Sequence, residues 1–505
     1  MANNPSNVNA TTVHIARQSA YGSLGGSPEW HALKPTTIGG GLAQTERAMH
    51  DTIDASNQYE AGSVVDVTAD VPLSQGLTYQ AATLLLPGAM RTSWSGPVAL
   101  ETAATRPTSA TSAHFVVPTM SASLPANTLI KVSGCAVAAN NGVKVVSSGG
   151  TTTQIPCSGL TAETFTAAQN VTIEVCGFQF ASGDLTVAVS GSTITLGTTT
   201  KDLTELTLVS GQSIWVGDSS NAAYSYATAA VGGPARLTAA PTANAMTVDS
   251  TFTTWTTDNG SSKTIRVYFG QTARVVARDS GSYSEGYYTV EHTIENLGAA
   301  NANRYQYTTD AVVDTLTLAA PSAALATLEA SLVGVDVEST DTRKTNAGTP
   351  TLAKRTIAYS PTADISGRLK LLSDGTALTG YITSATVTIE NGAQRNPAHG
   401  VLGSAVTSFG KIRVRVSIEA FLTESALIAA ARSNLAVSAN IWLRNADGAI
   451  VLDVPEARVS TDSIGFPAGR VVTITGEVMA NADSTWSTSL IASRIPGCPA
   501  LIARA

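Results

Sequence analysis

A strand followed by a capped helix occurs twice in this chain, and this repetition limits the possible folds more than any other feature of the sequence. In residues 411–434 apolar side chains first alternate with polar ones and then give way to an Ala-rich stretch behind Thr423. Alternation with a period of two predicts a half-buried strand, and a threonine before an Ala-rich run predicts a helix N-cap. Residues 63–86 show the same succession, so the sequence predicts two copies of one unit.

The two copies align without a gap. An offset of 349 positions places Val416 on Val67 and Thr423 on Ser74. Ser74 is therefore the expected helix cap of the first copy.

A pair of alternating strands joined by a proline-containing turn follows each helix, in residues 314–334 and 456–478. Placing Thr473 on Thr327 gives an offset of 146 for this pair, which is 203 less than the first offset of 349. The first copy is therefore expected to contain an insertion about as large as a domain.

The inserted part, residues 106–275, consists of short apolar runs separated by Gly, Asn, Ser and Thr. Such a pattern of short apolar runs and turn residues is typical of small β-sandwich modules. The predicted organisation is a discontinuous first domain in residues 1–105 and 276–345, the inserted modules, and a second domain in residues 346–505 that ends in a C-terminal arm.

Composition restricts the class of protein. Only 13% of the residues are charged, against about 25% in an average soluble protein. The net charge is −7, and the longest basic run is Arg-Val-Arg at 413–415, which argues against a protein that reads nucleic-acid sequence. We expect a chain so low in charge to bury much of its surface against other chains.

The sequence predicts that the chain is synthesised in a cytoplasm and is present there first. Its first residues lack the apolar segment of a signal peptide, and the most apolar window is interrupted by Pro321 and Glu329, so no membrane insertion is predicted. The four cysteines lack the spacing of a metal site or of a redox pair, and we expect free thiols.

No arrangement of residues predicts catalysis, a cofactor or a metal site. The chain lacks a complete phosphate loop, a dinucleotide fingerprint and a nucleophile elbow. Glu291, His292 and Glu295 are the nearest approach to acid–base chemistry. On a strand, however, Glu291 and Glu295 share one face and His292 lies on the other, so we expect a surface or interface strand.

Three passages resemble the major tail tube proteins of long-tailed bacteriophages with non-contractile tails. They are IARQSAYGSLGGSPEWHAL at 15–33, SYSEGYYTVEHTIEN at 282–296 and YQYTTDAVVDTLTLAAP at 305–321. The repeated strand and helix pairs fit the same pattern, and the similarity spans most of both copies.

The resemblance implies a mainly β fold with two tail-tube-type β-sandwich or barrel domains, each flanked by an α-helix, plus inserted immunoglobulin-like β modules. It implies a structural, non-enzymatic virion protein that assembles into stacked rings and forms the hollow tube through which DNA passes during ejection. A chain with two tube domains would form a trimeric, pseudo-hexameric ring. The inserted modules would project outward, and we expect the tube to form without them.

The resemblance also implies partners and a location. The chain would assemble with itself, with the tape measure protein, and with the tail terminator and distal tail proteins, while phage DNA passes without specific binding. It would reside in the phage tail, after assembly in the host cytoplasm. Segments 36–62 and 388–410 would contact the adjacent ring.

The polar faces of the two main strands and one further strand supply the candidate lumen or ring-interface residues. These candidates are Asp66, Thr68, Asp70, Arg413, Arg415, Ser417, Glu419, Glu291 and Glu295. At the offset of 349, Asp66 stands where Arg415 stands in the second copy.

Other interpretations remain open at this point. The polar faces could simply be solvated. A β-modular surface adhesin or carbohydrate-binding protein, and a β-rich hydrolase with paired carboxylates, are alternative functions.

Overall fold

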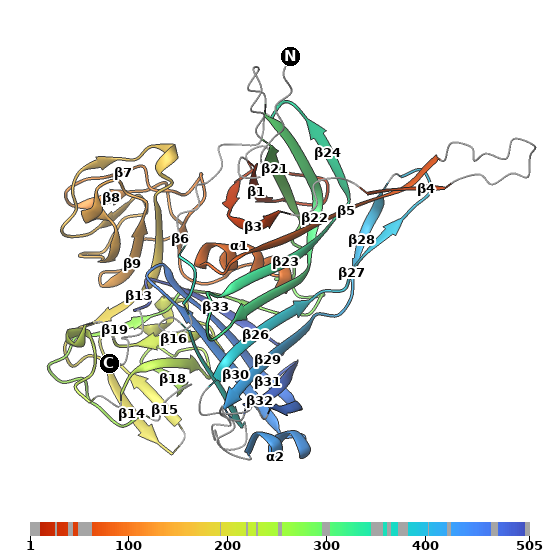
Figure 1. The fold of residues 1–505 in the computed structure, drawn as a ribbon. Helices are drawn as coiled ribbons and strands as arrows, with labels where there is room; N and C mark the ends of the chain where they lie inside the picture. Colours follow the sequence, from red (N-terminus) through yellow and green to blue (C-terminus); the bar gives the residue numbers. More distant parts are fainter. Residues whose placement is uncertain are drawn as a thin grey trace, which may run out of the picture.

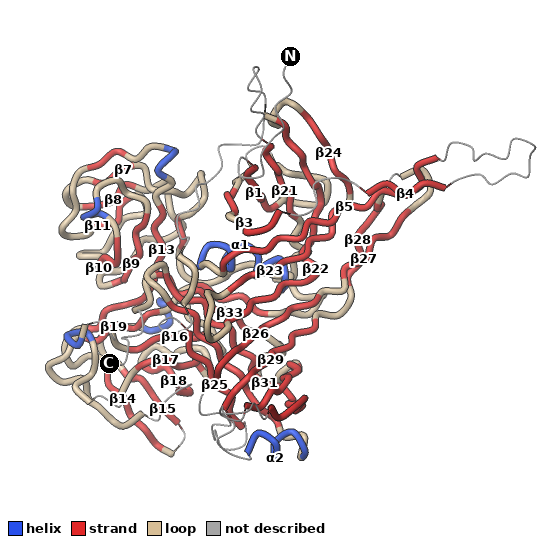
Figure 2. The backbone as a smooth tube through the Cα atoms, in the orientation of Figure 1, coloured by secondary structure: helices blue, strands red, loops and turns tan. Residues whose placement is uncertain are grey.

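The chain folds into a mainly β protein, as its sequence predicts. The computed structural model describes residues 11–25, 28–38, 44–48, 63–191, 193–218, 221–228, 231–250, 255–294, 303–344, 357–360, 365–371, 382–401, 403–421, 426–465 and 473–499. Within these residues there are two α-helices, α1 (Tyr79–Met90) and α2 (Ala426–Arg432), while strands dominate (Figures 1 and 2).

Two sets of five strands pair in the same order. The first set runs β1 (Thr11–Arg17), β21 (Tyr288–Ile294), β22 (Arg304–Ala320), β23 (Thr327–Gly334) and β5 (Ser63–Gly76). The second set runs β25 (Ile365–Leu371), β30 (Ala436–Arg444), β31 (Gly448–Gly465), β32 (Thr473–Asn481) and β29 (Arg413–Phe421). Helix α1 follows β5 and α2 follows β29, so each set ends in the strand that leads into its helix.

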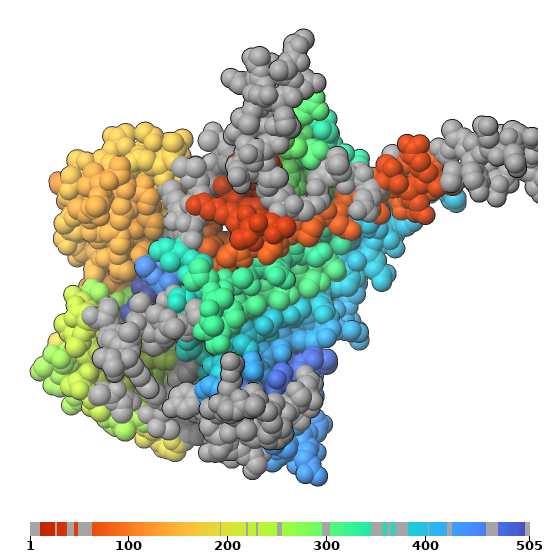
Figure 3. Space-filling view, in the orientation of Figure 1, coloured from red at the N-terminus to blue at the C-terminus, as the bar shows by residue number. Residues whose placement is uncertain are grey.

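Further strands extend the same sheet. They are β2 (His31–Leu33), β3 (Pro35–Ile38), β4 (Gln44–Ala48), β20 (Gln271–Arg274), β24 (Asp336–Thr340), β26 (Ile382–Glu390) and β33 (Ile491–Pro496). Strand β26 pairs with β22 on one side and β29 on the other, and so joins the two sets. A separate hairpin, β27 (Ala393–Pro397) and β28 (Ser404–Phe409), lies near β4, and in the space-filling view β4 projects from the body opposite the insertion (Figures 1 and 3).

The hairpins of the two sets agree with the offset of 146 found in the sequence, which we call the hairpin offset. Ala319 lies opposite Thr327 in the first hairpin, and Gly465 lies opposite Thr473 in the second. Ala319 and Thr327 therefore correspond to Gly465 and Thr473 at the same offset of 146.

The main strands, by contrast, align at 345 and not at the expected 349. Val71 lies opposite Leu332, and Val416 lies opposite Val478, which is the counterpart of Leu332 at the hairpin offset. A slip of four positions preserves the alternation of apolar and polar side chains, so the sequence pattern could not detect it. We call the value of 345 the corrected offset. The residue equivalent to Arg415 is consequently Asp70 rather than Asp66.

A matching β-bulge supports the corrected offset. In β3 the pairing with β5 skips Thr36, and in β26 the pairing with β29 skips Thr383. The Thr36 hydroxyl donates to the carbonyl of Ser74 and the Thr383 hydroxyl donates to the carbonyl of Glu419, each at 3.0 Å. Ser74 and Glu419 are themselves counterparts at the corrected offset, so the same local geometry occurs twice.

The first helix begins four positions later than the sequence indicates. Its N-cap is Thr78, which has an extended backbone and whose side-chain oxygen accepts the N–H of Ala81 at 3.2 Å. The expected cap, Ser74, is instead paired with Glu329 inside the sheet. The pairing of β5 with β23 extends through this position, and the helix starts only where the ladder ends. Thr423 lies outside the described residues.

The insertion forms two sheets of its own. The larger contains β6 (Ala99–Leu100), β9 (Thr128–Ser133), β10 (Gly142–Val145), β13 (Thr172–Phe180), β14 (Thr186–Ser190), β15 (Thr193–Gly197), β16 (Ser213–Val216), β17 (Gly233–Leu237), β18 (Ala245–Ser250) and β19 (Ile265–Tyr268). The smaller contains β7 (Ser109–Ala110), β8 (His114–Val116), β11 (Gln154–Pro156) and β12 (Glu163–Thr164). Short 3-10 helices lie at Ala138–Asn140, Ala167–Gln169, Leu203–Leu206 and Ala222–Tyr224. Strand β20, which the predicted boundary at 275 leaves with the insertion, pairs with β33 of the main sheet.

One hydrophobic core serves both five-strand sets. It includes Leu85 of α1 and Tyr288 of the first set, and Val416 and Leu452 of the second, all with at most 1% of their surface exposed. The insertion has a second core, around Phe115 and Phe180. The two sets are therefore fused, whereas the interior of the insertion is separate.

A third, smaller core joins the insertion to the second set. Trp215 and Tyr268 of the insertion pack against Trp442, Val451 and Ile495, and the rings of Trp215 and Trp442 meet edge to face at 5.7 Å. This packing argues against the expectation that the tube forms without the insertion, because its removal would uncover large apolar side chains.

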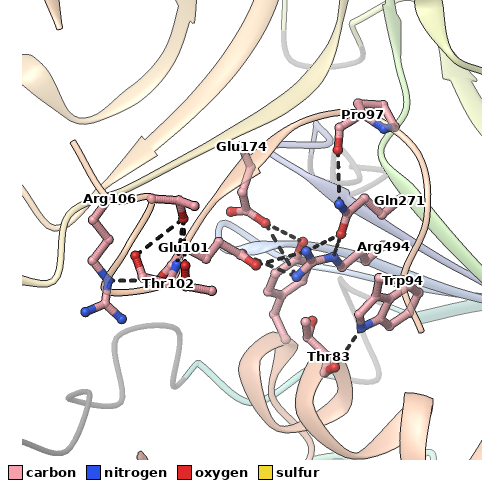
Figure 4. A network of polar contacts seen from close by, with 11 residues as sticks. Thr83, Trp94, Pro97, Glu101, Thr102, Arg106, Glu174, Gln271 and Arg494 are labelled. Carbon is pink, nitrogen blue, oxygen red and sulfur yellow. Dashed lines mark hydrogen bonds and ion pairs between the residues drawn. The ribbon is translucent and has the colours of Figure 1, made fainter. Parts of the chain in front are cut away.

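Buried charges reinforce the same junction. Arg494 of β33 bonds to Glu101 at 2.9 Å and to Gln271 at 2.9 Å, and approaches Glu174 of β13 at 3.9 Å (Figure 4). The Tyr79 hydroxyl of α1 donates to Glu174 at 3.4 Å. The insertion therefore contacts helix α1 and strand β33 at one point.

No helix among the described residues combines the length and the apolar character needed to cross a membrane. The four cysteines are buried and carry free thiols.

Candidate functional site: the polar face of the main sheet

The main sheet presents one continuous polar face, built by alternation along six neighbouring strands. These strands are β5, β23, β22, β26, β29 and β32, in that spatial order. Their apolar residues point into the shared core, so the intervening side chains point to the other side. We call this side the polar face. Its members are Asp66, Thr68, Asp70, Pro72, Ser74, Glu329, Ser331, Thr315, Thr317, Ser384, Thr386, Thr388, Glu390, Arg413, Arg415, Ser417, Glu419, Thr475, Glu477 and Met479.

Hydroxyl groups occupy the middle of the polar face. Thr317 and Thr388 lie opposite each other across the β22–β26 pairing, with their hydroxyl oxygens 3.5 Å apart. Threonine suits this position because its branched side chain packs well on a pleated surface while its hydroxyl remains available to water. The two central strands of the face, β22 and β26, therefore present mainly hydroxyl groups to the solvent side.

One of the two arginines of the polar face, Arg415, is paired with carboxylates of neighbouring strands. Arg415 donates to both carboxylate oxygens of Glu390, at 2.7 and 2.9 Å, and lies 3.8 Å from Glu477. The hydrogen bonds and the negative charge of Glu390 raise the pKa of Arg415. Arg395 of β27 similarly bonds to Asp70. Arg415 and Arg395 are consequently engaged within the chain, while Arg413 at the start of β29 is exposed.

Seven of the nine candidate residues lie on the polar face. Asp66, Thr68 and Asp70 lie on β5, while Arg413, Arg415, Ser417 and Glu419 lie on β29. Three strands separate β5 from β29, a distance of roughly 19 Å at about 4.8 Å per strand. Asp66 and Arg415 therefore do not meet within one chain.

Glu291 is not a surface residue. Its side chain is fully buried and accepts hydrogen bonds from Tyr307 at 2.8 Å and from Arg343 at 2.9 and 3.0 Å, with His14 3.0 Å away. Burial alone raises the pKa of Glu291, but the hydrogen bonds of His14, Arg343 and Tyr307 outweigh it and lower the pKa to about 2. Glu291 is thus a structural carboxylate, and Glu295 lies outside the described residues.

His292 is buried on the opposite side of β21 from Glu291. Burial lowers the pKa of its imidazole. The alternation expected for this strand is therefore present, but both faces are enclosed by the protein and neither is an exposed surface.

Sequence reasoning missed the contributions of β22, β23, β26 and β32 to the polar face. The signal was present, because TLTLA at 315–319 and SATVTIE at 384–390 alternate as clearly as the main strands do. Their common face followed only from the strand pairing.

No arrangement of side chains on the polar face indicates catalysis or metal binding. Its carboxylates are spread along the sheet or paired with arginine, and among the described residues no three His, Cys, Asp or Glu side chains gather as a metal ion requires. A broad, hydroxyl-rich surface that carries more carboxylates than arginines is suited to contact with water and to weak interaction with polyanions.

Comparison with known proteins supports a structural role. A family model described as phage tail tube protein matches residues 177–478, more than half of the chain. The match begins in β13 of the insertion and continues through the second five-strand set. No curated protein matches the sequence.

Proposed function

This chain belongs to the phage tail tube protein family, and from this premise we propose that it builds the wall of a hollow tail tube through which DNA passes. Its role is structural, and the family assigns it to the tail of the virion. The finer statements below, on rings and on the passage of DNA, are proposals.

The repeated five-strand order is the observation that carries the proposal. Each set would fill one position of a ring, and the β22–β26 pairing shows one way in which two neighbouring positions can be joined. We propose that the sets arose by duplication and that three chains supply six positions. Equivalent positions with closed symmetry leave no sheet edge exposed, which protects a low-charge, strand-rich protein from aggregation.

We propose that the polar face lines the lumen. The insertion contacts α1, and α1 packs on the core side of the sheet, so the insertion would lie outside the tube wall. DNA affinity grows with each phosphate contact made by Lys or Arg. Since the face carries more carboxylates than arginines and Arg415 is already bonded to Glu390, the face would let DNA move without retaining it.

The tail tube would also meet other components at its ends and in its lumen. We propose the tape measure protein, the tail terminator and the distal tail proteins as partners, with assembly in the host cytoplasm. Contacts between stacked rings would involve the projecting region of β4 and the β27–β28 hairpin, which lie within segments 36–62 and 388–410.

Negative-stain microscopy of the purified protein tests the proposal directly. We expect rings or tubes with a central channel, and native mass spectrometry of a single ring should give the mass of three chains. Rings of six chains would refute the trimer. A protein that remains monomeric at high concentration would refute the tube.

A further inference from the structure

A cleft with a volume of about 670 Å³ lies at the seam between the two five-strand sets. The first set contributes Arg91, the C-cap of α1, and the second set contributes Lys411, which lies directly before β29. Residues 275–278, which follow β20, and residues 487–489, which lie beyond the end of β32, complete much of its wall. We call this site the seam cleft.

The seam cleft is cationic, in contrast to the chain as a whole. Arg91, Arg278 and Lys411 belong to its wall, and no carboxylate does among the residues that the structure describes. The whole chain, by comparison, has a net charge of −7. Three positive charges that surround one cavity create a local potential that attracts an anion.

The two outer cations of the seam cleft are weakly neutralised. Arg278 lies 3.9 Å from Glu285, at the limit of an ion pair, and 73% of its side chain is exposed. Lys411 is exposed and makes no hydrogen bond or ion pair with any described residue. Both side chains are therefore available to a ligand that enters the cleft.

Arg91 is the most buried of the three cations, with 4% of its surface exposed. Its terminal nitrogens donate to the carbonyls of Asn391 at 2.8 Å and Gly410 at 3.2 Å, and its guanidinium lies 4.4 Å from the centre of the Phe409 ring. Its Nε is buried and has no hydrogen-bond partner among the described residues. A buried charged donor without a partner is unfavourable, and it marks a place where an oxygen ligand is missing.

The charges of the seam cleft act on one another. Burial lowers the pKa of Arg91, the neighbouring Tyr283 raises it, and the like charge of Arg278 lowers it. The two guanidinium groups are thus close enough to repel each other across the cleft. An anion placed between them would remove this repulsion.

We propose that the seam cleft binds a peptide segment of a second copy of this chain, with a carboxylate of that segment among Arg91, Arg278 and Lys411. This inference rests on the proposed self-assembly and identifies a contact between side chains, separate from any strand pairing. The carboxylate would receive charge-assisted hydrogen bonds from the two outer cations, which are the strongest that side chains form.

The wall of the seam cleft favours a protein segment over DNA. Val275, Phe409, Ile412 and Ala480 add apolar surface between the cations. A peptide can offer a carboxylate together with apolar side chains that gain from burial, whereas the backbone of DNA offers phosphate alone.

Charge complementarity indicates a second copy as the source of the segment. The chain contains 37 acidic and 30 basic residues, so the surface of one copy presents an excess of carboxylates to the cleft of another.

A capped hexapeptide of alternating glutamate and leucine tests the chemistry of the site in free chains. Calorimetric titration should show binding that Arg278→Gln/Lys411→Gln weakens about tenfold or more, because each charge-assisted contact adds to affinity. Arg304→Gln/Lys34→Gln is the matched control and should bind as the unmodified protein does. Arg304 resembles Arg278, since 67% of its side chain is exposed and it lies 3.4 Å from Asp341. Equal binding by the two double variants would overturn the site.

Carbodiimide coupling of assembled protein tests the second copy as the source. The reagent joins the Lys411 amine to an adjacent carboxylate through an amide bond, with loss of water to the reagent. We expect a two-chain product on a denaturing gel and, by mass spectrometry of its digest, a link between Lys411 and an Asp or Glu of the other chain. Links from Lys411 that stay within one chain would overturn the second copy.

The outcomes separate this inference from the proposed function. Binding of an oligothymidylate in place of the peptide would overturn the protein ligand. Tubes built from protein whose cleft neither binds the peptide nor links to a second chain would overturn the inference and leave the tube function standing. If the unmodified protein forms no rings or tubes, the tube function is refuted, and peptide binding that depends on Arg278 and Lys411 would still support the carboxylate site.

Discussion

Thr36 and Thr383 occupy the same position in two β-bulges, and each donates its hydroxyl to the carbonyl of the residue opposite at 3.0 Å. The residues lie far apart in sequence and belong to different halves of the main sheet. A β-bulge occurs at one defined position of a strand, whereas alternation is preserved by any shift of an even number of residues. The recurrence of the bulge with the same side-chain hydrogen bond therefore fixes the alignment of the two sets more firmly than alternation does.

Removing either hydroxyl should destabilise the chain, but not equally. Thr383→Val should lower the free energy of unfolding by about 1 kcal/mol, because its bond is partly buried. Thr36→Val should cost less, since Thr36 is exposed. Urea unfolding of both variants measures the difference, with Thr386→Val on the polar face as the control. Equal losses at all three sites would contradict the assigned role.

Reversing the charge at Arg415 should impair assembly, because it places a third carboxylate beside Glu390 and Glu477. Arg415→Glu is expected to lower stability by up to about 1 kcal/mol, since these side chains are partly exposed and screened by water. The exchange Arg415→Glu/Glu390→Arg should restore part of the loss. Thermal unfolding at low and high salt checks both effects, and an unchanged melting temperature in Arg415→Glu would show that the pair is not significant.

The buried Glu291 predicts loss of stability in acid. Its pKa is lowered in the folded state to about 2, below the ordinary value of 4.5. A lowered pKa contributes stability above the unfolded value, and this contribution decreases as the pH falls from about 4.5 toward 2. The contribution at neutral pH is about 3 kcal/mol.

Glu291→Gln should therefore be destabilised at pH 7 and should show a weaker dependence on pH below 4.5. Glu338→Gln, which breaks the exposed pair with Lys344, is the matched control and should change little. Chemical unfolding between pH 2 and pH 7 provides the comparison. Parallel pH profiles for Glu291→Gln and the unmodified protein would refute the role of Glu291.

We expect the chain to be soluble only when the insertion is present. Trp215→Ala removes the ring that packs on Trp442 and lies beneath Arg444, and should lower the free energy of unfolding by about 3 kcal/mol or more. Tyr224→Ala is the control, because the stacking of Tyr224 on Arg266 stays within the insertion. Deleting residues 106–268 should give aggregated protein, and a soluble deletion variant that forms tubes would contradict this view.

The sequence predicted the features that depend on local pattern. Alternation identified the β class and the two main strands, and the hairpin offset agreed with the observed pairing. The cap at Ser74 was wrong because Ser74 and Thr78 are both suitable caps and lie four positions apart, which strand alternation does not distinguish. A local pattern therefore defined the elements but not their exact register.

Features that depend on contacts between distant residues were not predictable from one sequence. Glu291 is buried because His14, Tyr307 and Arg343 converge on it from three separate segments. The polar face likewise became continuous only when β26 was found between β22 and β29. The packing of Trp215 on Trp442 joins residues separated by more than two hundred positions, and no spacing in the sequence indicates it.

The core shared by the two five-strand sets restricts how this protein can change over generations. Two copies with separate interiors could be lost, exchanged or inherited one at a time. Here Leu85 and Tyr288 belong to the same interior as Val416 and Leu452, so a recombinant gene that lost one copy would encode a protein with half of its interior open to water. Loss of either five-strand set is therefore disfavoured, and substitutions at the core positions of one set must remain compatible with those of the other.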